Sequence, residues 1–355
     1  MITFIDNQKK TYQISNTGKL KIIRIRLQSR KYGRIGRLFA ELRYSRKIIK
    51  SISNYKDIKC DAIICYSPSI FYGRAINWLK REYNSKAYLI VRDIFPRWAL
   101  DAGVIKEGSL YKYFKFVESV LYSSSDFIGI ESKKDLDYFK NFELDVSTKV
   151  EVLNNWGATL SNKNKAPLNF LIDTSKVNIV YGGNMGSAQD LLSLVKLIDV
   201  SILKNRAVIY LIGSGNQFND IKKVIIDKKL SNIVLMQTIE RNNFLSLMTK
   251  SDIGLCSLNE KLVSNNYPLK MIGYMQLSKP VLAHINSGNE IIQMIRDNNI
   301  GLASIGSDGE SFNKNLDSLI TNKAMREELG QNAFNLFNNR FSVKTAASQI
   351  LNYFK

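Results

Sequence analysis

A lysine in the C-terminal third of the chain stands where a phosphate group could bind. Lys270 lies in the first turn of a predicted helix over 268–277, two residues after Pro268. A proline is tolerated at that position because the first helical turn needs no backbone donor. Free N–H groups at a helix start, together with an ammonium group, suit a phosphate. The alternative is a basic residue on an ordinary helix of an α/β domain.

Two glycine-rich segments follow predicted strands in the same half of the chain. They contain Gly183, Asn184, Met185 and Gly186 in the first and Gly213 and Gly215 in the second. Glycines permit tight turns in which backbone N–H groups approach a ligand closely. Neither segment is a GxGxxG or a P-loop motif. Two such turns at neighbouring strand ends favour a ligand cleft, with simple turn formation as the alternative.

Two further polar residues lie at the carboxyl ends of predicted strands. Asp93 could accept a proton or bind a sugar hydroxyl, or else pair with Arg92 or Arg97 in its own loop. His284, the single histidine, could donate to a phosphate or hydroxyl, and a buried structural histidine is the alternative. One histidine excludes a multi-histidine metal site and an HExxH motif, and no GxSxG elbow is present.

The charge of the chain is strongly positive and unevenly placed. The 355 residues carry 51 Lys and Arg against 31 Asp and Glu, a net charge of +20. Residues 1–50 alone hold 14 basic and two acidic residues. Such a segment attracts nucleic acid, an anionic membrane or pyrophosphate-bearing substrates. Nucleic acid is disfavoured, because no helix-turn-helix, RNP or zinc motif and no stacking platform is present.

A basic amphipathic helix is predicted over 33–53. It could lie on an anionic lipid surface, and the alternative is a core-packed helix with a solvated basic face. The three cysteines form no CxxC pair, which indicates free thiols in a reducing compartment. Without a membrane-spanning run or signal-peptide pattern, we expect a cytoplasmic protein, peripheral on the inner face of the membrane.

Apolar strands alternate with helices along most of the chain, which predicts parallel sheets covered on both faces. Strands are expected at 2–6, 20–26, 61–67, 86–93, 126–131, 150–153, 177–181, 207–212, 233–236, 253–257, 281–284 and 302–305. Helices are expected at 33–53, 70–82, 109–122, 133–140, 187–202, 217–229, 241–250, 268–277, 288–297, 309–319, 322–338 and 343–354. A polar stretch over 157–175 is the best linker. The pattern predicts two doubly wound domains, 1–160 and 176–342, facing each other across a cleft.

Several segments together resemble a known family. Residues 181–186, 211–215 and 267–283, in this order and spacing, resemble retaining glycosyltransferases of family four, which have the GT-B fold of two Rossmann-like domains. Residues 91–113 look like the Asp-Ile-Phe-Pro segment of a bacterial subgroup that builds O-antigen and capsule, and 123–132 and 150–156 echo that subgroup. The subgroup includes N-acetyl-L-fucosamine transferases.

The resemblance implies transfer, with retention, of an N-acetylated amino sugar in surface polysaccharide synthesis. A UDP-sugar donor would lie on the second domain, with its diphosphate among the glycine turns, Pro268, Leu269, Lys270 and His284, and its base near Thr238 and Ile239. Asp93 would face an undecaprenyl-diphosphate-linked acceptor on the first domain. The last helix, 343–355, would pack on that domain. The family needs no metal or other cofactor, because a lysine and backbone donors neutralise the leaving diphosphate.

One departure from the family pattern leaves alternatives open. The positions of the family's acidic pair are Asn265 and Gly273 here, and the second acid of the pair binds the donor ribose. Glycine cannot accept those hydroxyl groups. A non-catalytic transferase-like subunit is therefore one alternative function. A nucleotide-sugar 2-epimerase, which uses a similar two-domain scaffold, is another.

Overall fold

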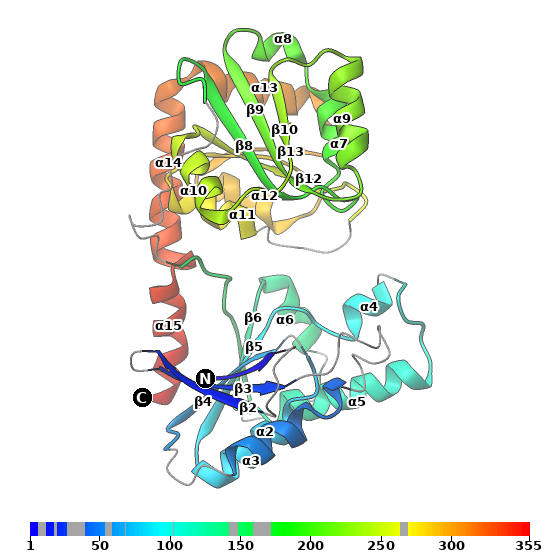
Figure 1. The fold of residues 1–355 in the computed structure, drawn as a ribbon, viewed down its shortest axis with the longest axis vertical. Helices are drawn as coiled ribbons and strands as arrows, with labels where there is room; N and C mark the ends of the chain where they lie inside the picture. The colour runs from blue at the N-terminus through cyan, green and yellow to red at the C-terminus, as the bar shows by residue number, and fades with distance from the viewer. Residues whose placement is uncertain are drawn as a thin grey trace. The chain divides into compact units, whose positions relative to one another are not determined.

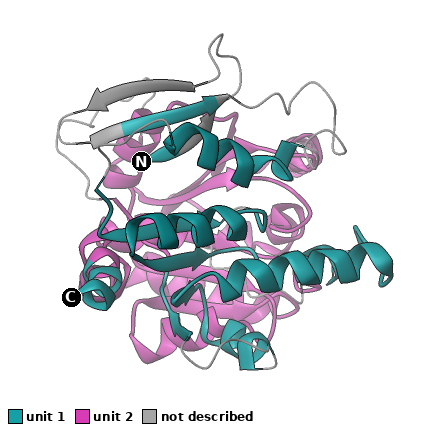
Figure 2. Cartoon of the chain, turned by 90° about the horizontal axis from the view of Figure 1, so that it is seen from below, with its two compact units in different colours: residues 1–154, 348–355 teal, residues 155–347 magenta. Residues whose placement is uncertain are grey.

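The computed structural model describes residues 1–5, 12–17, 20–26, 40–53, 59–67, 69–101, 103–140, 142, 148–158, 172–262 and 269–355. The chain forms two compact units, which are coloured separately in Figure 2. Unit 1 comprises residues 1–154 and 348–355, and unit 2 comprises residues 155–347. Each unit is built around its own parallel sheet, as Figure 1 shows.

Unit 2 contains a six-stranded sheet with the order β10-β9-β8-β11-β12-β13. Its strands are β8 (Val177–Asn184), β9 (Ala207–Ser214), β10 (Ile233–Met236), β11 (Ile253–Ser257), β12 (Val281–Ile285) and β13 (Gly301–Ile305). Every neighbouring pair is parallel. All the carboxyl ends therefore lie at one edge, where ligands bind in open α/β sheets.

Helices cover both faces of the unit 2 sheet. They are α7 (Leu191–Leu197), α8 (Val200–Leu203), α9 (Phe218–Asp227), α10 (Arg241–Lys250), α11 (Leu269–Gln276), α12 (Glu290–Asp297), α13 (Gly309–Thr321), α14 (Lys323–Leu336) and the π-helical turn η3 (Phe337–Phe341). Along β8, Val180 belongs to the apolar cluster of Met271 and Tyr274, whereas Ile179 belongs to the cluster of Leu191 and Phe312. Both faces are buried, which explains the near-continuous apolar strands.

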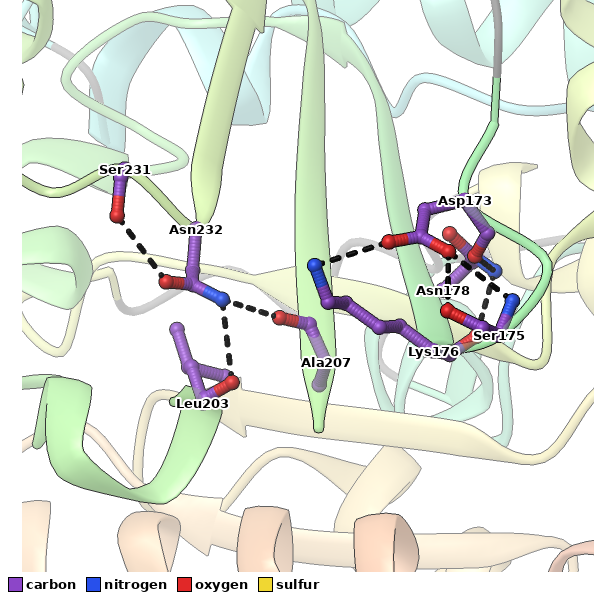
Figure 3. Close-up of polar contacts among 8 residues, drawn as sticks. All are labelled: Asp173, Ser175, Lys176, Asn178, Leu203, Ala207, Ser231 and Asn232. Atoms are coloured by element: carbon purple, nitrogen blue, oxygen red, sulfur yellow. Dashed lines mark hydrogen bonds and ion pairs between the residues drawn. The ribbon is translucent and has the colours of Figure 1, made fainter. Parts of the chain in front are cut away.

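Side-chain hydrogen bonds close the amino edge of this sheet (Figure 3). The Asn232 amide donates to the carbonyl of Ala207 at 2.9 Å, and the Asn178 amide donates to the carbonyl of Lys176 at 2.8 Å. Lys176 also pairs with Asp173 at 2.9 Å, and bonds from Ser175 and Lys176 lower the pKa of that carboxyl to about 2. The Asn232 bond joins the starts of β9 and β10, and the other bonds fix the segment that leads into β8.

Unit 1 contains a four-stranded parallel sheet with the order β4-β5-β6-β7 and a three-stranded sheet with the order β1-β3-β2. The strands are β1 (Ile2–Ile5), β2 (Tyr12–Thr17), β3 (Leu20–Arg26), β4 (Ala62–Ser67), β5 (Lys86–Val91), β6 (Phe127–Ile130) and β7 (Lys149–Val152). The helices are α2 (Tyr44–Ile52), α3 (Gly73–Tyr83), α4 (Arg97–Asp101), α5 (Ser109–Ser123) and α6 (Lys133–Lys140). The predicted α/β fold with two parallel sheets is confirmed.

The C-terminal segment contributes to unit 1. Helix α15 (Val343–Leu351) is followed by the short 3-10 turn η4 (Asn352–Phe354). The Gln349 amide donates to the carbonyl of Val152, and the Tyr353 hydroxyl donates to Glu151, both at 2.9 Å. The Tyr353 ring also lies 4.3 Å from the ring of Phe127, centre to centre. These contacts attach the end of the chain to β6 and β7.

Several local predictions were wrong. The segment between the first two predicted strands contains β2, which pairs antiparallel with β3 and was missed because polar residues fill most of its positions. The predicted helix over 187–202 is two helices, because the Asp199 side chain accepts from the Ser201 N–H and starts α8 anew. The first part of the predicted helix 33–53 lies outside the described residues.

Within the described part of the chain, no helix combines the length and apolarity that a bilayer span requires.

Candidate functional site

The two glycine-rich segments are the paired ends of β8 and β9. Gly183 is directly opposite Gly213 in the ladder, and Asn184 is opposite Ser214. Gly183 has φ +140° and Gly213 has φ +155°, and a Cβ on Gly213 would lie 1.8 Å from the Gly183 carbonyl oxygen. Only glycine fits this backbone conformation and this close approach. Strands β8 and β9 therefore extend into the glycine-rich segments, which were predicted to be turns.

Met185 holds the two segments together after the strands end. Its N–H donates to the carbonyl of Ser214 at 2.8 Å, and its carbonyl accepts from the N–H of Gln217 at 3.0 Å. The Met185 side chain is fully buried, and Gly215 packs against the Met185 carbonyl. Met185 thus serves as the connection between the two segments, and its own backbone groups are occupied.

The residues beside Met185 leave backbone donors available. The side-chain amide of Asn184 donates to the side chain of Gln189 at 2.9 Å. The backbone carbonyl of Asn184 accepts from the Tyr181 hydroxyl at 2.6 Å. By contrast, the N–H groups of Gly186, Ser187, Gly215 and Asn216 make no hydrogen bond to any described residue. Asn216 and Ser187 are linked by a side-chain bond of 3.3 Å, which holds the two segments next to each other. Four N–H groups on two adjacent segments suit an anion.

Lys270 stands over the end of β8. Its side chain is half-buried, and Nζ lies 3.8 Å from the centre of the Tyr181 ring and 3.6 Å from where a Cβ on Gly183 would lie. No acidic side chain among the described residues pairs with this ammonium group. Burial lowers the pKa of Lys270 to about 8, against a smaller opposing effect of Cys256. The ammonium group is therefore charged at neutral pH and desolvated without an anion, which a bound phosphate would correct.

The next strand end along the edge carries the residues expected near the base. Thr238 is exposed just after β10, and its hydroxyl donates to the Ser214 hydroxyl at 3.3 Å. Ile239 is half-buried against the apolar cluster of α11. Leu269, the first residue of α11, is 63% exposed, and Pro268 lies outside the described residues. The structure thus brings Thr238 to the β9 end that also carries Gly213.

His284 is buried on β12 with both ring nitrogens occupied. Nδ1 lies 2.9 Å from the Ser304 hydroxyl, and Nε2 donates to the carbonyl of Gly306 at 3.1 Å. Burial lowers the pKa of His284, so the neutral imidazole is favoured. These bonds fit the alternative interpretation of His284 as a buried structural histidine. Donor binding by His284 remains a prediction, without a free ring nitrogen to support it.

Asp93 lies in unit 1, just after β5. Its side chain is exposed and makes neither a hydrogen bond nor an ion pair with a described residue. Arg97 instead pairs with Asp101 at 2.9 Å, and Arg92 donates to the carbonyl of Leu153 at 2.6 Å. The salt-bridge alternative is therefore wrong, and the carboxylate is available to a ligand.

The site includes features that the sequence did not indicate. Tyr181 supplies the ring beneath Lys270, and burial raises the pKa of its hydroxyl, which bonds to Asn184. The signal available was an aromatic residue immediately before the two glycines. Gly273 lies one turn after Lys270, and a Cβ there would sit 3.5 Å from the Met248 Cε, an ordinary contact. Position 273 therefore has room for a side chain that it lacks.

Comparison with known proteins defines the class of the fold. Residues 163–336, which fill most of unit 2, match the family model described as glycosyl transferases group 1. Sucrose-phosphate synthase from Thermosynechococcus elongatus superposes with a TM-score of 0.70 at 14% identity, over 99% of this chain and 88% of that one. Anabaena HepE in complex with UDP superposes with a TM-score of 0.62 at 12% identity, over 94% and 85%. The fold is GT-B, and residues 163–336 within unit 2 are similar to glycosyl transferases group 1.

One sequence relative is more specific. A probable glycosyltransferase of Pseudomonas aeruginosa, WbjE, is 22% identical over 240 residues, which are 66% of this chain and 57% of that protein. The matched region thus spans less than two thirds of the relative. The segments that carry Lys270 and the paired glycines lie within the family match in unit 2.

Proposed function

We propose that the protein is a glycosyltransferase that transfers a sugar from a UDP-sugar. The observation that carries this proposal is the charged, half-buried Lys270, which stands without an acidic partner among the described residues beside the glycine ends of β8 and β9. The family match and the UDP bound to the Anabaena neighbour support a nucleotide-sugar donor.

The proposed chemistry follows from where charge develops. When the bond between the anomeric carbon and the diphosphate oxygen breaks, both electrons leave with UDP. The acceptor hydroxyl oxygen forms the new bond to the anomeric carbon, and its proton passes to the departing diphosphate. Lys270 and the free N–H groups beside Met185 would meet the growing negative charge, which lowers the barrier. These donors act in place of a metal ion in this proposal.

The finer assignment concerns the acceptor and the stereochemistry. We propose a lipid-linked acceptor in surface polysaccharide synthesis, an N-acetylated amino sugar as the group transferred, and retention at the anomeric carbon. The free carboxylate of Asp93 is the group we propose to contact the acceptor sugar. The segment resemblance of residues 91–113 supports this assignment.

Nucleotide binding tests the donor proposal directly. A ligand that binds only the folded protein raises its apparent melting temperature. We expect UDP and UDP-N-acetylhexosamines to raise it, and CMP and GDP-mannose to leave it unchanged. If no nucleotide raises the melting temperature, the donor proposal is wrong.

The affinity for UDP should depend on pH through Lys270. Its ammonium form is present below the pKa of about 8, so the affinity is full there and falls above pH 8, approaching about tenfold per pH unit. Without ligand the sign is opposite. The unfolded state holds this proton up to the ordinary value of 10.5, so Lys270 makes the folded state more stable as pH rises from 8 to 10.5. Titration calorimetry on the protein and on Lys270→Met measures the first effect. A pH profile shared by both proteins would contradict it.

A second candidate function is a non-catalytic transferase-like subunit. Gly273 favours it, because no carboxylate stands one turn after Lys270 to hold a ribose. Binding of UDP without turnover of any radiolabelled UDP-sugar, with or without lipid-linked acceptors, would support this candidate. Release of UDP that depends on an acceptor would exclude it.

A further inference from the structure

Helix α5 of unit 1 exposes a row of large apolar side chains. Leu110 is 53% exposed, Tyr113 44% and Phe116 65%. Their spacing of three residues places them on one side of the helix, and Val117 and Val120 continue that side toward its end. Exposed apolar residues are ordinary when scattered, but a continuous row indicates an interaction surface.

A groove adjoins this row. It has a volume of about 570 Å³ and lies where α2, α3 and α5 meet, helices that Figure 1 shows close together. Its lining combines basic and apolar side chains, among them Arg43, Arg46, Arg74, Tyr113 and Phe116. We call the groove and the α5 row together the helix surface.

The charge of the helix surface is one-sided. Arg43, Arg46 and Arg74 are exposed, and the described residues that line the groove include no acid. Glu41 lies beside it in sequence, but its carboxylate accepts a 2.6 Å bond from the Ser69 hydroxyl. None of the three arginines forms an ion pair with an acidic side chain among the described residues. The surface therefore presents positive charge next to exposed aromatic and aliphatic side chains.

We propose that the helix surface docks on an anionic lipid bilayer. The three arginines would contact lipid phosphates, while Phe116, Tyr113 and Leu110 enter the boundary between headgroups and acyl chains. Basic side chains flanking an apolar face are the combination that binds charged membrane surfaces. A neutral apolar partner would not use the arginines, and an acidic soluble partner would not need the exposed Phe116. The inference deepens the proposed function, since a lipid-linked acceptor is reached at a bilayer, but it depends on unit 1 residues alone.

Vesicle sedimentation tests the proposal with the full chain and without donor. We expect binding to vesicles of phosphatidylcholine and phosphatidylglycerol in equal parts, little binding to pure phosphatidylcholine, and weaker binding at high salt. Each arginine near an anionic surface contributes about 1 kcal/mol, so Arg46→Glu with Arg74→Glu should weaken binding by at least about 30-fold. Phe116→Ser should weaken it by about 10-fold or more, because the phenyl ring no longer enters the bilayer.

Matched controls are available on α9 of unit 2. Lys222→Glu with Lys223→Glu makes the same charge change at two exposed lysines, and Ile226→Ser removes a side chain that is 63% exposed. We expect these variants to bind vesicles within about threefold of the unmodified protein. All variants should keep the UDP-induced rise in melting temperature, which shows that they are folded.

Three results would overturn the proposal. The first is equal binding to both kinds of vesicle, and the second is equal losses in the α5 and α9 variants. The third is a dimer in solution without lipid that Phe116→Ser dissociates, since the surface would then bind a second copy of the chain. In each case the UDP response is measured separately, so the donor proposal stands or falls on its own result.

Discussion

Lys270→Met should lower UDP-sugar turnover by about 100-fold to 1000-fold while leaving the protein folded. The ammonium group is the only charge among the described residues placed at the paired glycines, 3.8 Å from the Tyr181 ring. Methionine keeps the length and apolar contacts of the side chain, and it removes the charge that the leaving diphosphate requires. Since the ammonium group is desolvated in the free protein, its loss should not destabilise the fold. Radiolabelled UDP-sugar turnover and denaturant unfolding measure the two effects.

Lys279→Met is the matched control. Burial also lowers the pKa of Lys279, but its ammonium group donates to the carbonyl of Thr249 at 3.0 Å, away from the glycine segments. This variant should lose about 1 kcal/mol of unfolding free energy with its hydrogen bond and keep its turnover. Undiminished turnover in Lys270→Met would show that the diphosphate does not use this lysine.

Gly213→Ala should abolish UDP binding and cost about 3 kcal/mol or more of unfolding free energy. The new Cβ would lie 1.8 Å from the carbonyl oxygen of Gly183, a backbone atom that cannot move aside without breaking the ladder. The left-handed backbone conformation adds to this cost. Denaturant unfolding gives the stability, and calorimetry gives the affinity for UDP.

Gly273→Ala makes the same chemical change where the structure has room. Position 273 is in the interior of α11, and its new Cβ would contact Met248 at 3.5 Å. Alanine favours a helix over glycine, so the unfolding free energy should stay equal or rise by up to about 1 kcal/mol. If both variants unfold at the same denaturant concentration, Gly213 does not lie as close to the Gly183 carbonyl as this explanation requires.

The parallel sheets were predictable because buried parallel strands are apolar along their whole length. The same rule gathers Lys270, Thr238 and the paired glycines at one edge of unit 2, since all strands of the sheet end there. The lengths of β8 and β9 were not predictable. Glycine usually ends a strand, but here Gly183 and Gly213 extend the ladder in a conformation open only to glycine.

Contacts between side chains from distant segments could not be predicted from the sequence. The hydrogen-bond partners of His284 are Ser304 and Gly306, which belong to the next strand and the turn after it. No pattern in the sequence around His284 predicts them. Tyr181 meets Lys270 only through tertiary packing. The hydrogen bonds of the Met185 backbone to a neighbouring segment also arise from tertiary packing. The groove of unit 1 is lined from three helices far apart in the sequence. Periodicity reports which face of an element is buried, not which residues it meets.

The attachment of the last residues to β7 has a consequence for biosynthesis. Glu151 accepts hydrogen bonds from the hydroxyls of Tyr88 and Tyr353, and Tyr353 also packs on Phe127. Residues 348–355 are translated after the contiguous residues 155–347. Of the two units, unit 1 therefore begins first and is completed last, and a nascent chain halted before Tyr353 should hold a finished unit 2 and an unfinished unit 1.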